Sequence, residues 1–223
     1  MYIAANGMKL WYETRGGGSP LLLLHGNGED HTVFSTLSKA LEGEFRIWAV
    51  DSRGHGRSTK TGEISYALMA KDIAEFLSLA GCEKPLCVGF SDGGIVGLML
   101  ANRYPGLLGG LIACGANASP KGLSNGFRAV TAAKNFFARD PLLKLMLNEP
   151  NISNAELESI SVPTLIAAGS RDLIKREETL RIARAIPGAE IRIFLGETHS
   201  SYIVGSAKLA PVIRGFASKN GLR

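Results

Sequence analysis

One stretch decides the fold of this chain: residues 85–97, which read PLCVGFSDGGIVG. An apolar run leads into Ser91 and a second apolar run follows it, so we expect a strand that turns at the serine into a helix. Strand and helix would pass closest two residues before and two residues after the serine, where Gly89 and Gly93 leave room. The turn would hold the Ser91 hydroxyl beside the free N–H groups of a helix start, which attract negative charge. The stretch therefore predicts a nucleophilic serine next to an anion-binding site.

Apolar strand patterns alternate with helical patterns on both sides of this stretch. Strands are expected at 2–5, 8–14, 21–24, 45–50, 85–90, 107–114, 162–168 and 191–195. Helices are expected at 32–42, at 65–80, from 92 to a stop at 104–106, at 175–186 and at 203–217. This alternation predicts an α/β fold, a mostly parallel sheet flanked by helices.

Residues 118–160 interrupt the alternation. Helical apolar spacing continues through them, three prolines punctuate it, and no strand pattern occurs. We expect a small helical cap insertion at 120–160, set into an α/β core made by 1–119 and 161–223. Apolar side chains of this insertion are the expected walls of a substrate pocket: Phe127, Phe136, Phe137, Leu143 and Met146.

Composition fits one folded domain with a large core, since 45% of the 223 residues are hydrophobic and 20% are charged. The formal net charge is +5, but Lys and Arg are dispersed. A solvated basic surface is therefore favoured over a nucleic-acid partner, with an anionic substrate or a membrane headgroup as the alternative. Two of the three cysteines, Cys87 and Cys114, lie in apolar runs, which favours a reducing compartment. With no leader pattern and no apolar stretch of membrane-spanning length, we expect a cytoplasmic protein.

Reactive side chains follow the ends of five apolar strands: His25, Asp51, Ser91, Asp172 and His199. The carboxyl ends of parallel strands share one edge of a sheet, so residues far apart in sequence are gathered there. A serine hydroxyl needs a base to take its proton, and the base needs a third group to orient it.

His199 is the expected base, because it lies on a loop after the last strand. His31 is instead expected at the surface and His55 in a loop between two glycines. Asp172 is the expected orienting acid, since it follows a strand and lies between the serine and the histidine in the chain. The other acids considered, Glu177 and Glu178, lie inside the next predicted helix and are expected to face solvent.

The oxyanion of an acyl-transfer intermediate needs two preorganised donors. We assign them to the backbone N–H of Asp92, directly after the serine, and to the backbone N–H of Asn27. The second lies in the loop after the strand at 21–24, where two glycines let the backbone approach. The imidazole of His25 is expected to hold this loop by hydrogen bonds.

Five motifs occur in one order along the chain: HGNG at 25–28, DSRGHGRS at 51–58, GFSDGG at 89–94, GSRD at 169–172 and GETH at 196–199. As a set they resemble the α/β-hydrolase superfamily. The resemblance implies a mainly parallel eight-stranded sheet and a reaction that needs no cofactor and no metal. Members with an aspartate nucleophile, the haloalkane dehalogenases and epoxide hydrolases, are disfavoured because Ser91 stands at that position. The motif at 51–58 carries no established chemistry and is expected to be a tight structural loop.

The Ser-Asp-Gly-Gly form of the turn is similar to that of valacyclovir hydrolase-like esterases. There the equivalent carboxylate recognises a substrate amino group, which implies that Asp92 could favour α-amino esters. The alternative is that Asp92 only caps the start of the helix.

These residues predict a serine hydrolase that cleaves a small carboxylic ester through a Ser91–His199–Asp172 triad and an acyl-enzyme. An amide, a thioester or the carbon–carbon bond of a dienoic diketone is the alternative on the same machinery. A ligand sensor that uses the fold only for binding is the alternative of a different class.

Overall fold

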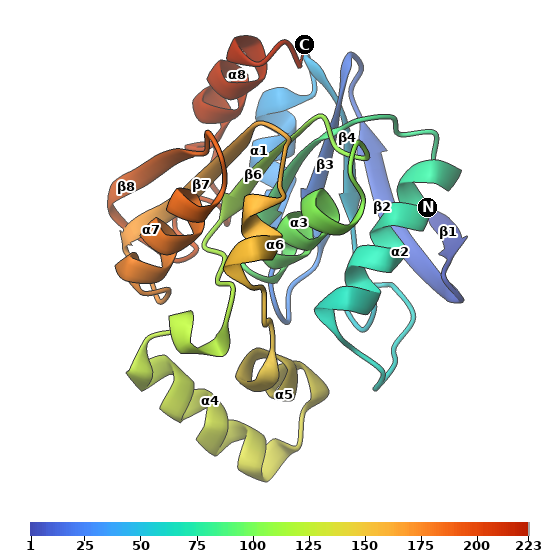
Figure 1. The fold of residues 1–223 in the computed structure, drawn as a ribbon. Helices are drawn as coiled ribbons and strands as arrows, with labels where there is room; N and C mark the ends of the chain where they lie inside the picture. Colours follow the sequence, from blue (N-terminus) through green and yellow to red (C-terminus); the bar gives the residue numbers. More distant parts are fainter. Residues whose placement is uncertain (223) are drawn as a thin grey trace.

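The computed structural model describes residues 1–222, which form an eight-stranded sheet (Figure 1). The strand order is β1-β2-β4-β3-β5-β6-β7-β8, and six strands from β4 to β8 run parallel, while β1 and β2 are antiparallel to their neighbours. The strands are β1 Tyr2–Ala5, β2 Met8–Arg15, β3 Ser19–Leu24, β4 Phe45–Val50, β5 Leu86–Phe90, β6 Gly110–Cys114, β7 Thr164–Arg171 and β8 Glu190–Thr198. The expected mostly parallel sheet of an α/β fold is confirmed.

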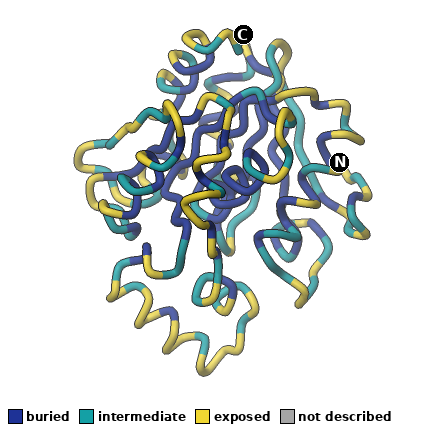
Figure 2. The backbone as a smooth tube through the Cα atoms, in the orientation of Figure 1, coloured by how far each residue is buried: buried dark blue, intermediate teal, exposed yellow. Residues whose placement is uncertain are grey.

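Helices cover both faces of the sheet and enclose two apolar clusters. One face carries α2 (Tyr66–Leu79), α3 (Asp92–Arg103), α6 (Asn154–Glu158) and α7 (Arg176–Ala185). The other carries the 3₁₀ helix η1 (His31–Phe34), α1 (Ser35–Leu41) and α8 (Ala210–Lys219). The central strands are therefore buried on both sides, as the dark blue centre of Figure 2 shows. This explains the unbroken apolar runs that identified them in the sequence.

The C-terminal helix is shorter than expected. The prediction placed it at 203–217, whereas α8 begins at Ala210. Gly205 adopts a positive φ of 63° and Pro211 lies in the first turn of the helix. A left-handed glycine ends a helical run, and proline suits a first helical turn, so the two residues delay the start. Tyr202 and Ile203 are buried within the preceding turn and mimic helical spacing.

The segment between β6 and β7 contains the helices that the sequence suggested: η2 (Pro120–Gly122), α4 (Asn125–Ala138), α5 (Pro141–Asn148) and α6. Leu157 of α6 is buried in the core, whereas α4 and α5 form a hairpin that projects from the body of the molecule (Figure 1). We propose that 120–160 is a cap on a core made by 1–119 and 161–223, with the α4–α5 hairpin as its projecting part.

The loop at 51–58 is fixed from within. Arg53, 2% exposed, donates to both carboxylate oxygens of Asp72 on α2, each at 2.6 Å. Asn6 adds a 2.7 Å hydrogen bond to the same carboxylate. A planar, two-point pair of this kind ties the loop to α2 and to the turn between β1 and β2.

Removing the charge of Asp72 is expected to destabilise the fold. Asp72→Asn keeps the side-chain volume but leaves the guanidinium of Arg53 buried without its counter-charge, which should lower the free energy of unfolding by about 3 kcal/mol. Urea unfolding followed by circular dichroism measures the change. The exposed pair Lys219–Glu190 is the control, and Glu190→Gln should cost less than about 0.5 kcal/mol. Equal effects of the two variants would contradict this account.

Candidate active site

Ser91 lies at the turn between β5 and α3 in a strained backbone conformation, with φ 53° and ψ −114°. A Cβ atom on Gly89 would lie 2.1 Å from the carbonyl oxygen of Gly93, and one on Gly93 would lie 2.0 Å from the carbonyl oxygen of Leu24. Any side chain at either position would collide with backbone. The spacing of the two glycines thus has the steric cause inferred from the sequence, and it allows the turn to present the serine above the sheet edge.

The structure brings together three side chains that are far apart in the sequence. Nε2 of His199 lies 3.0 Å from Oγ of Ser91, and Nδ1 of His199 lies 2.6 Å from Oδ1 of Asp172. One hydrogen-bonded chain therefore leads from the serine through the imidazole to the carboxylate. In this arrangement Nδ1–H donates to Asp172, which leaves Nε2 free to accept the hydroxyl proton.

Backbone groups hold the carboxylate of Asp172 in place. Its Oδ1 accepts a hydrogen bond from the N–H of Ile174 at 3.0 Å, and its Oδ2 accepts one from the N–H of Gly169 at 3.2 Å. The side chain is only 3% exposed. A carboxylate with fixed hydrogen bonds can orient the imidazole of His199 without moving itself.

Gly115 is a site residue that sequence reasoning missed. It has a φ of 59°, and a Cβ atom there would lie 2.7 Å from Cε1 of His199. The glycine therefore leaves the space that the imidazole occupies, with the ring of Phe90 on another side at 4.9 Å between centroids. The available signal was a glycine directly after the strand at 107–114.

The two residues assigned as oxyanion donors, Asp92 and Asn27, lie at the start of α3 and on the loop after β3. Asp92 is the first residue of α3, so its N–H has no partner within the helix. Asn27 lies on the loop after β3, and its N–H has no hydrogen-bond acceptor among the described residues. Both residues line the same cavity as Ser91. The Asn27 side chain fixes the loop, since its Nδ2 donates to Oδ2 of Asp92 at 2.8 Å and to the carbonyl oxygen of Leu142 at 3.3 Å.

The side chain of Asp92 is nearly buried, at 5% exposure. Its oxygens accept hydrogen bonds from Nδ2 of Asn27 and from the hydroxyl of Tyr66, both at 2.8 Å. Burial raises the pKa of the carboxyl group, and these two donors oppose the shift. Both contacts are to side chains outside α3, while the carboxylate also lies in the first turn of that helix, where negative charge is stabilising.

His25 holds the loop below this site. Its Nε2 accepts a hydrogen bond from the N–H of Ser52 at 3.0 Å, and its Nδ1 donates to the carbonyl oxygen of Gly26 at 2.8 Å. Burial lowers the pKa of the imidazole from its ordinary 6.5 to about 4. A neutral imidazole that bridges two loops fits the structural role predicted for it.

The depressed pKa of His25 predicts acid destabilisation. The unfolded chain takes up a proton near pH 6.5, but the folded protein does not do so until about pH 4. The free energy of unfolding should therefore fall by roughly 3 kcal/mol as the pH drops through this window. Urea unfolding at pH 7, 5.5 and 4.5 measures the loss. His25→Gln should be less stable at pH 7 but should lose less on acidification; an unchanged slope would contradict the assignment.

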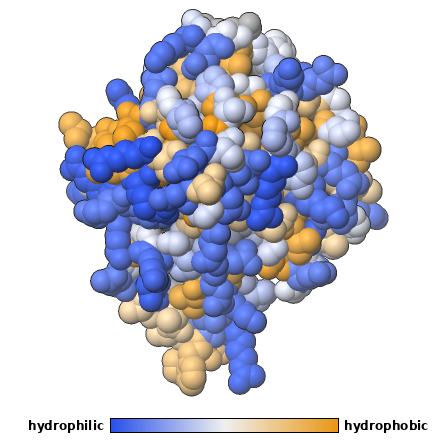
Figure 3. All heavy atoms as spheres, in the orientation of Figure 1, coloured by the Kyte–Doolittle hydropathy of each residue, from blue (hydrophilic) through white to orange (hydrophobic). Residues whose placement is uncertain are grey.

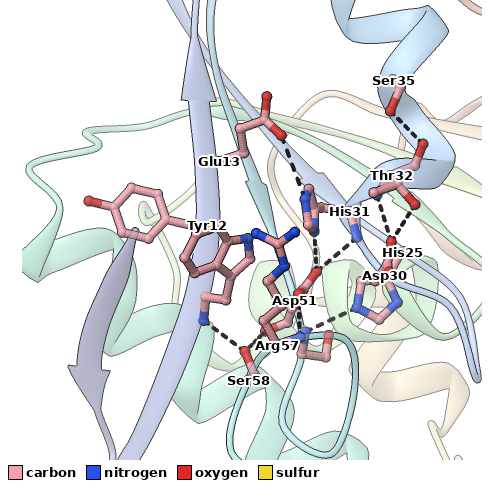
Figure 4. A network of polar contacts seen from close by, with 12 residues as sticks. Tyr12, Glu13, His25, Asp30, His31, Thr32, Ser35, Asp51, Arg57 and Ser58 are labelled. Carbon is pink, nitrogen blue, oxygen red and sulfur yellow. Dashed lines mark hydrogen bonds and ion pairs between the residues drawn. The ribbon is translucent and has the colours of Figure 1, made fainter.

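Asp51 belongs to a separate buried network behind the site (Figure 4). Its Oδ1 accepts hydrogen bonds from the backbone N–H and Nδ1 of His31, at 2.8 and 2.7 Å, and its Oδ2 accepts one from the N–H of Arg57. Ligand atoms of Asp30, His31 and Asp51 lie within 4.8 Å of one another, and the Asp51 carboxylate already accepts three hydrogen bonds from protein groups. We interpret the group as structural, which agrees with the tight loop expected at 51–58.

Two expectations about exposure are wrong. His31 was expected at the surface but is 8% exposed, because its ring is hydrogen-bonded to the buried carboxylate of Asp51. Glu178 was expected to face solvent but is also 8% exposed. Its carboxylate accepts hydrogen bonds from the N–H of Ala118 and from the guanidinium of Arg181, which hold it against the loop after β6. Glu177 is exposed, as expected.

A cavity of about 360 Å³ opens above Ser91. The cap supplies Phe127, Leu143 and Met146 to its wall, as expected from the sequence. Phe136 and Phe137 do not line it, and they are 78% and 84% exposed. Phe136 follows Phe127 by nine residues, which rotates it by about 180° around a helix, so the two rings lie on opposite faces of α4. The prediction that both later phenylalanines are pocket walls is corrected.

Three carboxylates line the cavity: Glu29, Asp92 and Glu149. No Lys or Arg among the described residues lines it. Sequence reasoning missed Glu29, which follows the HGNG motif directly. Its Oε2 accepts a hydrogen bond from the N–H of Gly26 at 3.0 Å, and burial raises the pKa of its carboxyl group. Glu149 accepts a hydrogen bond from the N–H of Tyr66 and so joins the cap to α2.

Comparison with known proteins gives a family match and several relatives. The model of the alpha/beta hydrolase fold matches residues 19–144. A Mycobacterium tuberculosis protein without an assigned activity is 30% identical over 151 residues, which cover 67% of this chain but only 44% of that protein. The chain therefore matches less than half the length of this relative. A putative esterase/lipase of Haemophilus influenzae is 24% identical over 90% of this chain and 83% of its own.

Solved structures share the fold along the whole chain. The enol-lactonase of Burkholderia xenovorans LB400 has a TM-score of 0.82 and 22% identity, and the alignment covers 98% of this chain and 100% of that one. In the part of the chain that the structure describes, no helix has the length and apolar character needed to cross a bilayer.

Proposed function

The chain belongs to the α/β-hydrolase fold family, and from that premise we propose that it is a serine hydrolase that cleaves small carboxylic esters. One observation carries the proposal: the hydrogen-bonded chain Ser91–His199–Asp172 places the Ser91 hydroxyl in the wall of a cavity lined by apolar cap side chains and by three carboxylates. A hydroxyl with a base 3.0 Å away and a buried carboxylate behind that base is the arrangement of an activated nucleophile.

The proposed reaction has two halves. Oγ of Ser91 attacks the carbonyl carbon while Nε2 of His199 takes the hydroxyl proton, and the backbone N–H groups of Asn27 and Asp92 stabilise the oxyanion. The carbon–oxygen bond to the alcohol then breaks, and His199 returns the proton to the leaving oxygen. Water attacks the acyl-serine by the same proton transfers in reverse order and releases the acid. Throughout, Asp172 orients the imidazole and stabilises its positive charge.

A panel of p-nitrophenyl esters from acetate to decanoate tests the ester assignment. We expect turnover of the shorter chains and a decline once the acyl group outgrows a cavity of about 360 Å³. Amide and thioester analogues, run beside the panel, separate the alternative bonds. Folded protein that turns over none of these compounds would contradict the proposal and would favour a carbon–carbon hydrolase or a ligand-binding role.

A second candidate, an esterase for α-amino esters, is favoured by the three carboxylates and the lack of Lys or Arg in the described cavity wall. A substrate ammonium group would pair with the carboxylates of Asp92 and Glu29, which line the same cavity as Ser91. Both oxygens of Asp92 already accept hydrogen bonds, but each retains a further lone pair for such a group.

Asp92→Asn should separate the two candidates, because it keeps the side-chain shape and removes the charge. If the enzyme recognises amino groups, kcat/KM for amino-acid esters should fall about tenfold to a hundredfold, while uncharged esters of equal size change little. Parallel assays of a valine ester and an isovalerate ester measure the ratio. An equal loss on both substrates would leave Asp92 with a purely structural role.

A further inference from the structure

The outer face of α4 is apolar and uncovered. Val130, Phe136 and Phe137 are 54%, 78% and 84% exposed, and the two phenylalanine rings pack edge to face at 5.3 Å. Ala129 and Ala133 lie on the same side of the helix and are also exposed. Exposed apolar residues gathered on one helix face usually mark a surface that contacts something else. Figure 3 shows apolar atoms at the free end of the hairpin beside hydrophilic ones.

The hairpin and the short η2 helix before it carry a formal net charge of +4. Residues 120–148 contain five basic side chains and one acidic side chain, against a formal net charge of +5 for the whole chain. None of the five basic groups forms an ion pair with a described residue: Lys121, Arg128, Lys134, Arg139 and Lys144. The hairpin is therefore an apolar ridge flanked by unneutralised cations.

Charge and shape together select the occupant. A second copy of the chain would bring five like charges against five more, so self-association through this face is opposed by repulsion. The hairpin projects from the body of the molecule (Figure 1). A projecting apolar ridge can insert aromatic rings into a deformable surface such as a lipid bilayer. Lys and Arg can lay their aliphatic stems along apolar material while their charges reach phosphates.

We propose that the α4–α5 hairpin docks on an anionic lipid bilayer, with Phe136 and Phe137 entering the boundary of headgroups and acyl chains and the five cations facing lipid phosphates. The opposite side of the hairpin supplies Phe127, Leu143 and Met146 to the cavity. Docking would therefore bring the cavity close to the bilayer. This rests on the proposed esterase function: the substrates would be amphiphilic esters that partition into membranes and carry an acyl group small enough for the cavity.

Vesicle sedimentation tests the docking without relying on catalysis. Wild-type protein should bind vesicles of phosphatidylglycerol and phosphatidylcholine, should bind pure phosphatidylcholine at least tenfold more weakly, and should be released by about 1 M NaCl. The double variant Phe136→Ser/Phe137→Ser should lose at least tenfold in vesicle affinity and keep its activity on a water-soluble ester. Leu195→Ser on β8 is the matched control, since Leu195 is 86% exposed and lies outside the hairpin.

Three outcomes would overturn the docking. They are wild-type protein that ignores anionic vesicles, a double variant that binds as well as wild type, and a concentration-dependent dimer in size-exclusion chromatography that the double variant abolishes. Ser91→Ala should bind vesicles like the wild type, because docking does not use the hydroxyl. If the wild type binds vesicles but has no esterase activity, the proposed function alone is contradicted.

Discussion

Replacing Ser91 by alanine is expected to lower kcat on every ester substrate by at least about 10⁴-fold. The variant loses the oxygen that forms the acyl bond, while His199, Asp172 and both backbone donors stay in place. Alanine also carries a Cβ atom, so the strained φ of 53° is no worse for it than for serine. Single-turnover assays with p-nitrophenyl acetate, in which wild type shows a burst of product, measure the loss.

The control for this variant is its stability. Ser91→Ala should unfold within a few degrees of wild type, because its hydroxyl contributes one half-exposed hydrogen bond to His199. A folded variant that retains activity within tenfold of wild type would contradict the assignment of Ser91 as nucleophile.

Asp172→Asn should have an effect of similar size, about 10⁴-fold on kcat. The amide can donate a hydrogen bond to Nδ1 of His199, which favours the tautomer with its proton on Nε2. That nitrogen then cannot accept the proton of Ser91, although it lies 3.0 Å away. The loss should appear in kcat with little change in KM, since the carboxylate is buried behind the imidazole and does not line the cavity.

Glu177→Gln is the matched control for Asp172→Asn. It removes one carboxylate charge from the start of α7, close in sequence but exposed to solvent, and should leave kcat unchanged. If both substitutions reduce kcat alike, or if neither does, the acid of the proposed triad is assigned wrongly.

Much of this site could be predicted because chain geometry forces it. A strand that turns into a helix at a serine needs glycine two residues away on each side. In the structure, backbone atoms lie where a Cβ atom at either position would be. The positions of Asp172 and His199 followed from strand ends in a parallel sheet, where sequence distance gives no measure of spatial distance. The unbroken apolar runs of the core strands also have a geometric cause, which is burial on both faces of the sheet.

The rest depended on information that residue type does not carry. Phe136 and Phe137 are apolar like Phe127, and only the phase of α4 turns them outward. The burial of His31 and Glu178 depends on partners from distant segments, Asp51 and Ala118. Glu29 lines the cavity because of the conformation of the loop after β3, which residue type does not determine.

Covalent labelling with a fluorophosphonate, followed by mass spectrometry of the tryptic peptides, tests whether Ser91 is an activated nucleophile. Such reagents phosphonylate a serine only when a neighbouring base and an oxyanion site activate it. We expect one phosphonyl group per chain, attached to Ser91, and a much slower reaction in Asp172→Asn. Intact folded protein that is not labelled, or that is labelled at another residue, would contradict it.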